Sequence, residues 1–224
     1  MKPIAHIVTD FPDKFGIPRQ SGLIDELVGK IIFEKEYRDP SALKGLEQFS
    51  HIWLLWEFSQ AKRDTWSPTV RPPRLGGNKR MGVFATRSPF RPNPIGLSSV
   101  KLKEIAMEEE GPVLYVTGAD LMNGTPIFDI KPYIPLSDCH PDASEGYTKE
   151  TKLHFLQVVC PQELLEKIPK EKQMALLKTL EQDPRPAYLD DPTRQYGITF
   201  GNHNINFLVA NDTLTVTRVQ EIKS

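Results

Sequence analysis

The chain has 224 residues, of which 39% are hydrophobic and 25% charged, and its formal net charge is −1. These values are typical of a soluble globular protein with one large domain, or one domain and a small appendage. The longest uninterrupted apolar run, residues 52–56, is too short to cross a bilayer, so no membrane partner is expected. Cys139 and Cys160 lack the spacing of a redox pair and no signal peptide precedes them, which predicts reduced thiols and a cytoplasmic location.

The first predicted elements are strands. Weak alternation predicts a strand over residues 4–8, and a run rich in β-formers predicts another over 27–33. After a turn at 39–41, a short helix is expected over 42–48. Residues 49–58 are aromatic and branched, which predicts a central strand buried on both faces.

Two polar features accompany these early elements. His51, within the predicted central strand, is interpreted as a hydrogen-bonded core histidine, and Ser59 and Gln60 follow where that strand leaves the core. Between the first two strands, glycine and proline punctuate a loop that places Arg19, Gln20 and Ser21 at its exposed centre. A guanidinium, an amide and a hydroxyl in a row suit a small polar ligand, although a hydrated turn has the same composition.

The most distinctive stretch of the chain is residues 82–97. Val83–Ala85 is predicted to be a short buried strand, and Gly96 a turn back into a strand that runs from residue 97 to about 105. Between them lies the Pro loop, defined here as residues 86–94, which three prolines make stiff. The loop displays Arg87 and Arg91, and two guanidinium groups on a stiff loop suit an anionic ligand. An ordinary rigid surface loop is the alternative.

The charge of the chain is strongly polarised. Residues 62–103 contain ten Lys or Arg and one acid, Asp64, so this basic segment carries +9 and the remaining residues carry −10. Concentrated positive charge spaced by Pro and Gly is typical of proteins that bind RNA or nucleotides. A solvated basic face without a ligand is the alternative.

The second half of the chain changes character near residue 150. Residues 113–118 form a predicted strand, and Asp120, Asp129 and Lys131 are the charged residues nearest to its end. Residues 138–142 include possible metal ligands, but no second cluster accompanies them, so no metal is predicted. Two helices, 163–168 and 170–182, then precede three strands, 196–200, 204–209 and 213–219, with a hairpin turn at 211–212. The second helix is expected to bury Met174, Leu177 and Leu180 on one face.

Together these elements predict a mainly β protein with a domain over residues 1–147 and a small α+β domain over 148–224. Neither a dinucleotide-binding glycine motif, nor a P-loop, nor a nucleophile elbow is present. The residues alone therefore indicate a basic, stiff-looped site for a phosphate-bearing or nucleic-acid ligand, without specifying a reaction.

Five stretches in order along the chain add a family resemblance. They are residues 18–23, 49–53, 71–78, 82–97 and 129–133, and together they resemble the TrmO/TsaA-like (YaeB) family of S-adenosylmethionine-dependent tRNA adenosine N6-methyltransferases. Residues 183–188 are similar to the C-terminal domain of that family. The resemblance implies a single-sheeted β-barrel, a homodimer and N6-methylation of threonylcarbamoyladenosine next to the anticodon of tRNA.

The resemblance also implies roles for individual residues. The cofactor-binding residues would be Arg19, Gln20, Ser21, Ser59, Gln60, Arg87, Leu97, Thr117, Gly118, Ala119, Asp120 and Leu121. The candidate catalytic residues are Asp129 and Asp120, as carboxylates that accept the N6 hydrogen, and Tyr133, which, like Phe90, could stack on a base. The residues expected to hold the anticodon stem-loop are Arg71, Arg74, Lys79, Arg80, Arg91, Lys131 and Arg185.

Two alternatives to this function stay open. One is an RNA-binding module without catalysis, and the other is a methyltransferase of the same fold that acts on a different substrate. Cofactor binding separates the first from the family activity, and the identity of the methylated product separates the second.

Overall fold

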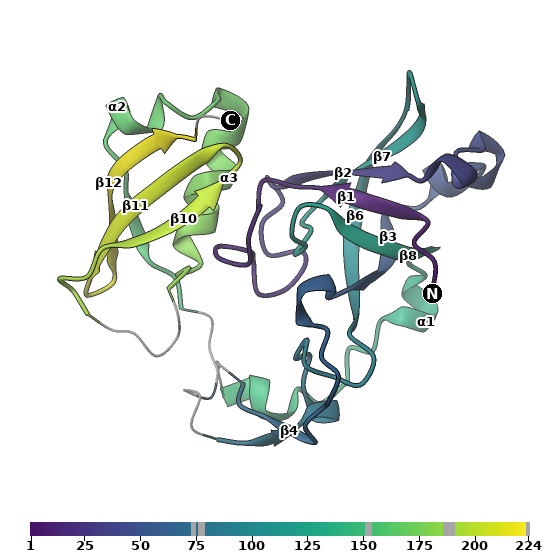
Figure 1. The fold of residues 1–224 in the computed structure, drawn as a ribbon, viewed down its shortest axis with the longest axis horizontal. Helices are drawn as coiled ribbons and strands as arrows, with labels where there is room; N and C mark the ends of the chain where they lie inside the picture. The colour runs from purple at the N-terminus through teal and green to yellow at the C-terminus, as the bar shows by residue number, and fades with distance from the viewer. Residues whose placement is uncertain (73–74, 76–78, 151–153, 186–190, 223–224) are drawn as a thin grey trace.

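The computed structural model describes residues 1–72, 75, 79–150, 154–185 and 191–222. An antiparallel barrel and a smaller α+β unit lie side by side (Figure 1), so the predicted mainly β fold class is confirmed.

The barrel closes six strands in the order β1-β2-β7-β6-β3-β8, and every neighbouring pair is antiparallel. The strands are β1 (Ala5–Val8), β2 (Val28–Phe33), β3 (His51–Glu57), β6 (Ile95–Glu108), β7 (Gly111–Thr117) and β8 (Thr125–Pro132). Alternate side chains such as Ile7, Ile31 and Leu114 are fully buried inside the barrel. Closure leaves no unpaired edge in this sheet.

The central strand differs from its prediction. β3 alternates between buried and half-buried residues, so only one face enters the core. The outer face of β3 carries the apolar residues Trp53 and Leu55, which is why the sequence resembled a strand buried on both faces. In the structure both residues are only half-buried. His51 is exposed, and its ring contacts the Ser50 hydroxyl at 2.9 Å, so the core-histidine interpretation is wrong.

Two short segments adopt 3₁₀ turns where other structures were predicted. Val83–Ala85 is a 3₁₀ turn instead of a strand, because the backbone N–H and hydroxyl of Thr86 both donate to the Val83 carbonyl and close the chain locally. The predicted helix over 42–48 is two 3₁₀ turns, Pro40–Leu43 and Leu46–Gln48, since Gly45 between them has a φ of +92°.

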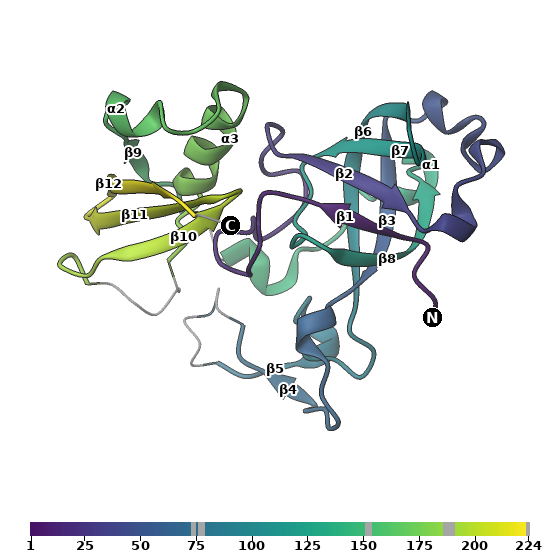
Figure 2. The same cartoon turned by 45° about the horizontal axis from the view of Figure 1, so that its top comes forward.

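The remaining elements outside the α+β unit are small. A two-stranded hairpin, β4 (Thr69–Val70) and β5 (Met81–Gly82), lies away from the barrel strands, as Figure 2 shows. The helix α1 (Pro135–Asp138) follows β8, and further 3₁₀ turns are Lys35–Tyr37, Ser59–Ala61 and Gly146–Glu150. No helix within the described ranges is long and apolar enough to cross a membrane.

The α+β unit packs helices against a four-stranded sheet in the order β10-β11-β12-β9. Its elements are β9 (Gln157–Val159), α2 (Gln162–Leu165), α3 (Lys170–Glu181), β10 (Tyr196–Phe200), β11 (His203–Ala210) and β12 (Thr213–Glu221), which confirms the predicted helices and strands with small shifts.

The buried face of α3 is rotated from its prediction. Met174 is 52% exposed, and the residues that face the core are Ala175, Leu176, Thr179 and Leu180. Thr179 can be buried because its hydroxyl donates to the Ala175 carbonyl at 2.8 Å. The pattern of large apolar residues did not predict the buried face of α3, because that face includes the small Ala175 and the polar Thr179.

A loop of the barrel contributes side chains to the hydrophobic core of the α+β unit. The β1–β2 loop, defined here as residues 9–27, leaves the barrel and places Phe11, Ile24 and Leu27 in the hydrophobic cluster of the α+β unit. The barrel has a separate cluster of its own. Figures 1 and 2 both show this loop beside the α+β sheet.

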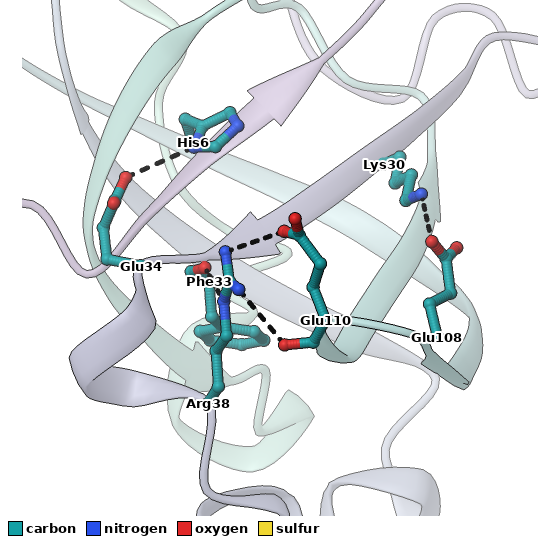
Figure 3. A network of polar contacts seen from close by, with 7 residues as sticks. All are labelled: His6, Lys30, Phe33, Glu34, Arg38, Glu108 and Glu110. Carbon is teal, nitrogen blue, oxygen red and sulfur yellow. Dashed lines mark hydrogen bonds and ion pairs between the residues drawn. The ribbon is translucent and has the colours of Figure 1, made fainter.

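Polar contacts tie the outer surface of the barrel together near the β6–β7 turn (Figure 3). Arg38 donates to the Phe33 and Glu110 carbonyls and pairs with the Glu110 carboxylate, while Lys30 pairs with Glu108. These groups are partly exposed, so each pair stabilises the fold only slightly.

Candidate functional site

A cavity of about 550 Å³ opens at one end of the barrel. Its walls come from the β1–β2 loop, the end of β3, the Pro loop, the start of β6 and the β7–β8 connection. The lining residues are Lys14, Ile17–Gln20, Trp56–Ala61, Thr86, Arg87, Pro89–Arg91, Ile95–Leu97, Asp120, Met122 and Thr125. Apolar walls with a few converging charged groups are typical of a small-molecule site.

The pairing of β3 with β6 brings together two residues that line the base of this cavity. Trp56 of β3 lies opposite Gly96 of β6. A Cβ atom at Gly96 would lie 2.3 Å from the Trp56 ring, so only glycine lets the indole lie against β6. Gly96 therefore serves a close approach within a strand, and the predicted turn at this residue is wrong. The Trp56 ring also packs on Phe58, with ring centroids 4.2 Å apart.

A chain of hydrogen bonds runs from this indole to the carboxylate of Asp120. Trp56 Nε1 donates to Ser98 Oγ at 3.0 Å, and Ser98 Oγ donates to Asp120 Oδ1 at 2.6 Å. Ser98 is only 2% exposed, so water does not compete for these bonds. The arrangement fixes the orientation of the Asp120 carboxylate at the cavity wall.

The electrostatics of Asp120 reflect this enclosure. Burial raises the pKa of its carboxyl above the ordinary value, and the hydrogen bond from Ser98 and the charge of Arg87 only partly offset this effect. The backbone N–H groups of Asp120 itself and of Ser21 also lower this pKa, but they do not outweigh burial. A desolvated carboxylate of this kind accepts a proton more readily than one in water.

The two arginines of the Pro loop behave differently. Arg87 Nη1 donates to Gln20 Oε1 at 2.7 Å, which joins the Pro loop to the β1–β2 loop across the cavity. Arg91 donates to the Thr86 and Ser88 carbonyls at 2.8 and 3.3 Å, so its guanidinium also stiffens its own loop. Both side chains line the cavity.

The structure separates the predicted cofactor residues into two groups. Those that line the cavity are Arg19, Gln20, Ser59, Gln60, Arg87, Leu97 and Asp120. Ser21, Thr117, Gly118, Ala119 and Leu121 do not line it. Ala119 and Leu121 are buried in the barrel core, while Gly118 holds the β1–β2 loop through backbone bonds to Gly22 and Leu27.

Of the candidate catalytic residues, the structure brings only Asp120 to the cavity. Asp129 lies opposite Leu55 in the sheet and pairs with Lys131 at 2.8 Å. Tyr133 follows β8, and its ring packs 5.5 Å from that of Trp53. Neither Asp129 nor Tyr133 lines the cavity wall, because Asp129 is on β8 opposite the half-buried Leu55 and Tyr133 follows that strand.

The predicted RNA-binding residues are also divided. Arg71, Lys79 and Arg80 are exposed on the β4–β5 hairpin segment, whereas Arg74 lies outside the described residues. Lys131 is 62% exposed but paired with Asp129. Arg185 forms two bonds to Asp183 in a largely buried pair, so its guanidinium is already engaged within the protein.

Sequence reasoning missed several residues at and near the cavity. Trp56, Phe58 and Met122 line its walls, and Ser98 orients Asp120. Exposed aromatic rings were also missed: Trp66 and Phe84 lie 6.0 Å apart, at 52% and 73% exposure. The alternation of β3 was the available signal for Trp56, but its pairing with Gly96 and Ser98 depends on register, which the sequence does not display.

A second hollow of about 610 Å³ lies on the α+β unit, lined mainly by charged and amide side chains of α2, α3, β12 and the connections that follow α2 and β10. It lacks the apolar walls of the barrel cavity. No group of three or more His, Cys, Asp or Glu suited to a metal ion occurs in the part of the chain that the structure describes.

Comparisons with known proteins agree with this geometry. The family profile of the tRNA-methyltransferase O N-terminal domain matches residues 6–139, and that of the C-terminal domain matches residues 154–222. The tRNA (adenine(37)-N6)-methyltransferase of Escherichia coli K12 is 42% identical over 216 residues, which cover 93% of this chain and 92% of that protein. A Pseudomonas aeruginosa protein, named as a candidate S-adenosylmethionine-dependent methyltransferase, is 38% identical over 92% of this chain and 91% of its own.

Solved structures extend the similarity to the fold. A crystal structure of TrmO from Pseudomonas aeruginosa has a TM-score of 0.79 and 33% identity, and the match covers 98% of this chain and 95% of that one. The fold and cavity define a β-barrel protein with a partly apolar cavity at one end of the barrel. The chain belongs to the tRNA-methyltransferase O family.

Proposed function

We propose that this protein transfers a methyl group from S-adenosylmethionine to N6 of the adenosine next to the anticodon of tRNA. The observation that carries the proposal is the enclosed barrel cavity, where Asp120 and Arg87 converge on apolar walls, in a chain that belongs to this family. The relative from Escherichia coli is named for the same modification at adenine 37.

The residues of the cavity fit the cofactor. Arg19 and Arg87 offer guanidinium groups for its carboxylate, and Trp56, Phe58 and Leu97 offer apolar surface for its adenine ring. Ser59 and Gln60 add polar contacts beside them. When bound, S-adenosylmethionine supplies an electrophilic methyl group on a positively charged sulfur. Gly118 supports the site from behind through backbone bonds to Gly22 and Leu27 of the β1–β2 loop, and the Leu121 carbonyl accepts from the Thr9 hydroxyl of the same loop.

Within this proposal, Asp120 is the group that accepts the proton. Adenosine N6 is a weak nucleophile because its lone pair is delocalised, so a carboxylate that takes its hydrogen accelerates the transfer. Asp120 is favoured over Asp129 because it lines the cavity and its carboxyl has a raised pKa. Glu57 also lines the cavity, but it pairs with Lys62 at 2.9 Å.

The finer identity of the substrate follows the family resemblance: the target is threonylcarbamoyladenosine. In that nucleoside N6 is a urea-type nitrogen with a single hydrogen, so methylation requires removal of that hydrogen. Methyl transfer to an unmodified amino group also releases one proton, but a urea-type nitrogen is the weaker nucleophile and its N–H is the more acidic, so a carboxylate base at the cavity contributes more with this substrate.

The tRNA is expected to lie on the basic segment. Arg71, Lys79 and Arg80 present charge for phosphates, and the exposed rings of Phe84 and Phe90 offer stacking surface for unpaired bases. Arg63 lies 4.0 Å from the Phe90 ring centroid, which adds a cation beside one of these rings.

Assembly and location are further parts of the proposal. A homodimer in the cytoplasm agrees with the family resemblance and with a tRNA substrate. Light scattering after size exclusion should give twice the chain mass of 25.4 kDa, and a single-chain mass at working concentrations would contradict the dimer.

A transfer assay tests the activity. The protein is incubated with isotope-labelled S-adenosylmethionine and bulk tRNA that carries threonylcarbamoyladenosine, and the tRNA is then digested for mass analysis. A labelled methyl group on that nucleoside is expected. A labelled methyl group on unmodified adenosine would show that adenosine itself is the substrate. Cofactor binding without any labelled nucleoside would indicate a substrate other than this tRNA. The absence of cofactor binding, with tRNA affinity retained, would favour a non-catalytic RNA-binding module.

A further inference from the structure

The β1–β2 loop forms one wall of the barrel cavity. Arg19 and Gln20, near its tip, both line the cavity, and Gln20 accepts the hydrogen bond from Arg87. Any displacement of this loop therefore changes the position of two cavity residues and removes a partner of the Pro loop.

On one side, the loop is fixed to the barrel by a few polar contacts. Gly22 donates to the Gly118 carbonyl at 2.8 Å, and Thr9 Oγ1 donates to the Leu121 carbonyl at 3.1 Å. These bonds reach the backbone beyond the end of β7, next to Asp120. They leave the apolar side chains of the loop to be buried elsewhere.

On the other side, the apolar side chains of the loop are buried by the α+β unit. Phe11, Ile24 and Leu27 are at most 4% exposed, and all three belong to the hydrophobic cluster of that unit. The Phe11 ring packs edge-on against Phe200 of β10, with centroids 5.8 Å apart. The α+β unit therefore covers the face of the loop that the barrel leaves uncovered.

Contact with the α+β unit continues toward the cavity residues. A Cβ atom at Gly16 would lie 3.2 Å from the Ile198 side chain, so Ile198 of β10 packs directly against the chain three residues before Arg19. β10 is an edge strand of the α+β sheet, and Figure 1 shows it on the side of that sheet nearest the barrel.

Two polar contacts clamp the start of the same loop. The Asp10 carbonyl accepts from the Gly201 N–H at 2.7 Å, and the Asp10 carboxylate pairs with Lys172 of α3. The Asp10 side chain is only 15% exposed, which strengthens the pair relative to one in water.

We propose that Lys172 and Ile198 of the α+β unit are positioning residues for the cofactor cavity, because they hold the β1–β2 loop that carries Arg19 and Gln20. The proposal rests on the proposed function, which assigns this cavity to S-adenosylmethionine. No described residue of the α+β unit lines the cavity, so in this proposal the unit acts through the loop.

The test compares two lysines of the same helix. Lys172→Met removes the pair with Asp10 of the loop, whereas Lys170→Met removes an exposed charge on the first turn of α3, for which the described residues show no ion pair with the loop. Lys172→Arg keeps the charge, and Ile198→Ala removes the apolar contact. For each variant, S-adenosylmethionine affinity is measured by calorimetry, kcat at saturating cofactor by methyl transfer, and amide hydrogen exchange over residues 13–23 by mass spectrometry.

We expect Lys172→Met and Ile198→Ala to weaken cofactor affinity about 10-fold and to speed amide exchange in the loop, with kcat at saturation changed by less than about 2-fold. Lys172→Arg should recover most of the affinity, and Lys170→Met should match the wild type. Should Ile198→Ala fail to fold, the lysine series answers the question alone.

The outcomes separate the two proposals. Faster loop exchange in Lys172→Met with unchanged cofactor affinity would overturn the positioning role, and so would equal losses in Lys172→Met and Lys170→Met. A wild-type protein that does not bind S-adenosylmethionine would instead contradict the proposed cofactor. In that case the exchange comparison still decides whether the α+β unit holds the loop.

Discussion

At the scale of the residue, the site depends on contacts between neighbouring strands. Nothing in the sequence marks Trp56, Gly96 and Ser98 as site residues. The register between β3 and β6 places the indole of the tryptophan against the glycine, and the indole N–H donates to the serine hydroxyl. The serine then orients Asp120. A large ring, a missing side chain and a buried hydroxyl therefore act together to present one carboxylate.

Gly96→Ala tests the close approach. The added methyl group would meet the Trp56 ring at 2.3 Å and force the indole to move. We expect the free energy of unfolding to fall by roughly 1–3 kcal/mol, and S-adenosylmethionine affinity to fall with it. Gly82→Ala is the matched control, because nothing lies within 4 Å of a Cβ atom there. Urea unfolding and calorimetry measure both effects, and equal losses in the two variants would contradict the steric argument.

Asp120→Asn tests the buried carboxylate. If Asp120 accepts the N6 proton, methyl transfer should fall by roughly 100-fold or more. The free energy of unfolding near neutral pH should rise in the same variant, because asparagine carries no charge to bury. The groups that face this carboxyl are Ser98, the Ser21 backbone N–H and Arg87, and together they do not fully compensate for its burial.

The sign of the stability change follows from the direction of the pKa shift. Because the folded-state pKa of Asp120 is raised, the wild type loses stability as pH rises from the ordinary carboxyl pKa of 3.8 through the folded value. The neutral asparagine lacks this loss. The melting temperature of the variant should therefore exceed that of the wild type near neutral pH, and the two should converge in acid. A variant less stable at neutral pH would contradict the assignment of burial as the dominant effect.

At the scale of the element, sequence patterns identified the regular parts of the fold. Alternation and β-rich composition were sufficient for β1, β2 and the three strands β10, β11 and β12, where one face of each is buried. Patterns failed where local hydrogen bonds decide the structure, as at Val83–Ala85, and where small or polar residues are buried, as on α3. The candidate site was predictable for Arg87 and Asp120, because loop and strand-end positions display charge. It was not predictable for Trp56 or Ser98, because their roles depend on pairing between strands.

The turn at Val83–Ala85 offers a test of RNA contact. Phe84 is 73% exposed and makes a ring contact with Trp66, within the basic segment. Phe84→Ser should leave the free energy of unfolding within about 0.5 kcal/mol of the wild type. If a base stacks on this ring, tRNA affinity should fall by roughly 5- to 150-fold, since stacking on an aromatic side chain contributes about 1–3 kcal/mol.

The control for Phe84 is Met107→Ser, on the barrel strand β6 and 66% exposed. Filter binding of tRNA at fixed salt compares the two variants. If Phe84→Ser binds tRNA like the wild type but runs as a monomer where the wild type is a dimer, the exposed rings form a subunit interface instead.

At the scale of the whole molecule, the barrel and the α+β unit are linked through a shared core. The sequence predicted a division near residue 147, but three side chains from the first 27 residues belong to the hydrophobic cluster of the later unit. A fragment of residues 148–224 would lack Phe11, Ile24 and Leu27. Small domains have little buried surface to spare, so the loss of three buried apolar side chains should prevent stable folding.

We therefore expect residues 148–224 alone to show little cooperative unfolding by circular dichroism and to bind a hydrophobic dye. The same fragment preceded by residues 9–27 through a flexible linker should recover a cooperative transition, because the loop supplies the missing core residues in cis. A version of the linked fragment with Phe11→Ser is the control, and it should fail to recover, since the Phe11 ring packs against Phe200. A stable, cooperative fold of residues 148–224 without the loop would show that the loop only rests on a finished domain. Failure of the bare fragment and recovery of the linked one would mean that the loop is structurally part of the α+β unit, although it lies in the chain between two strands of the barrel.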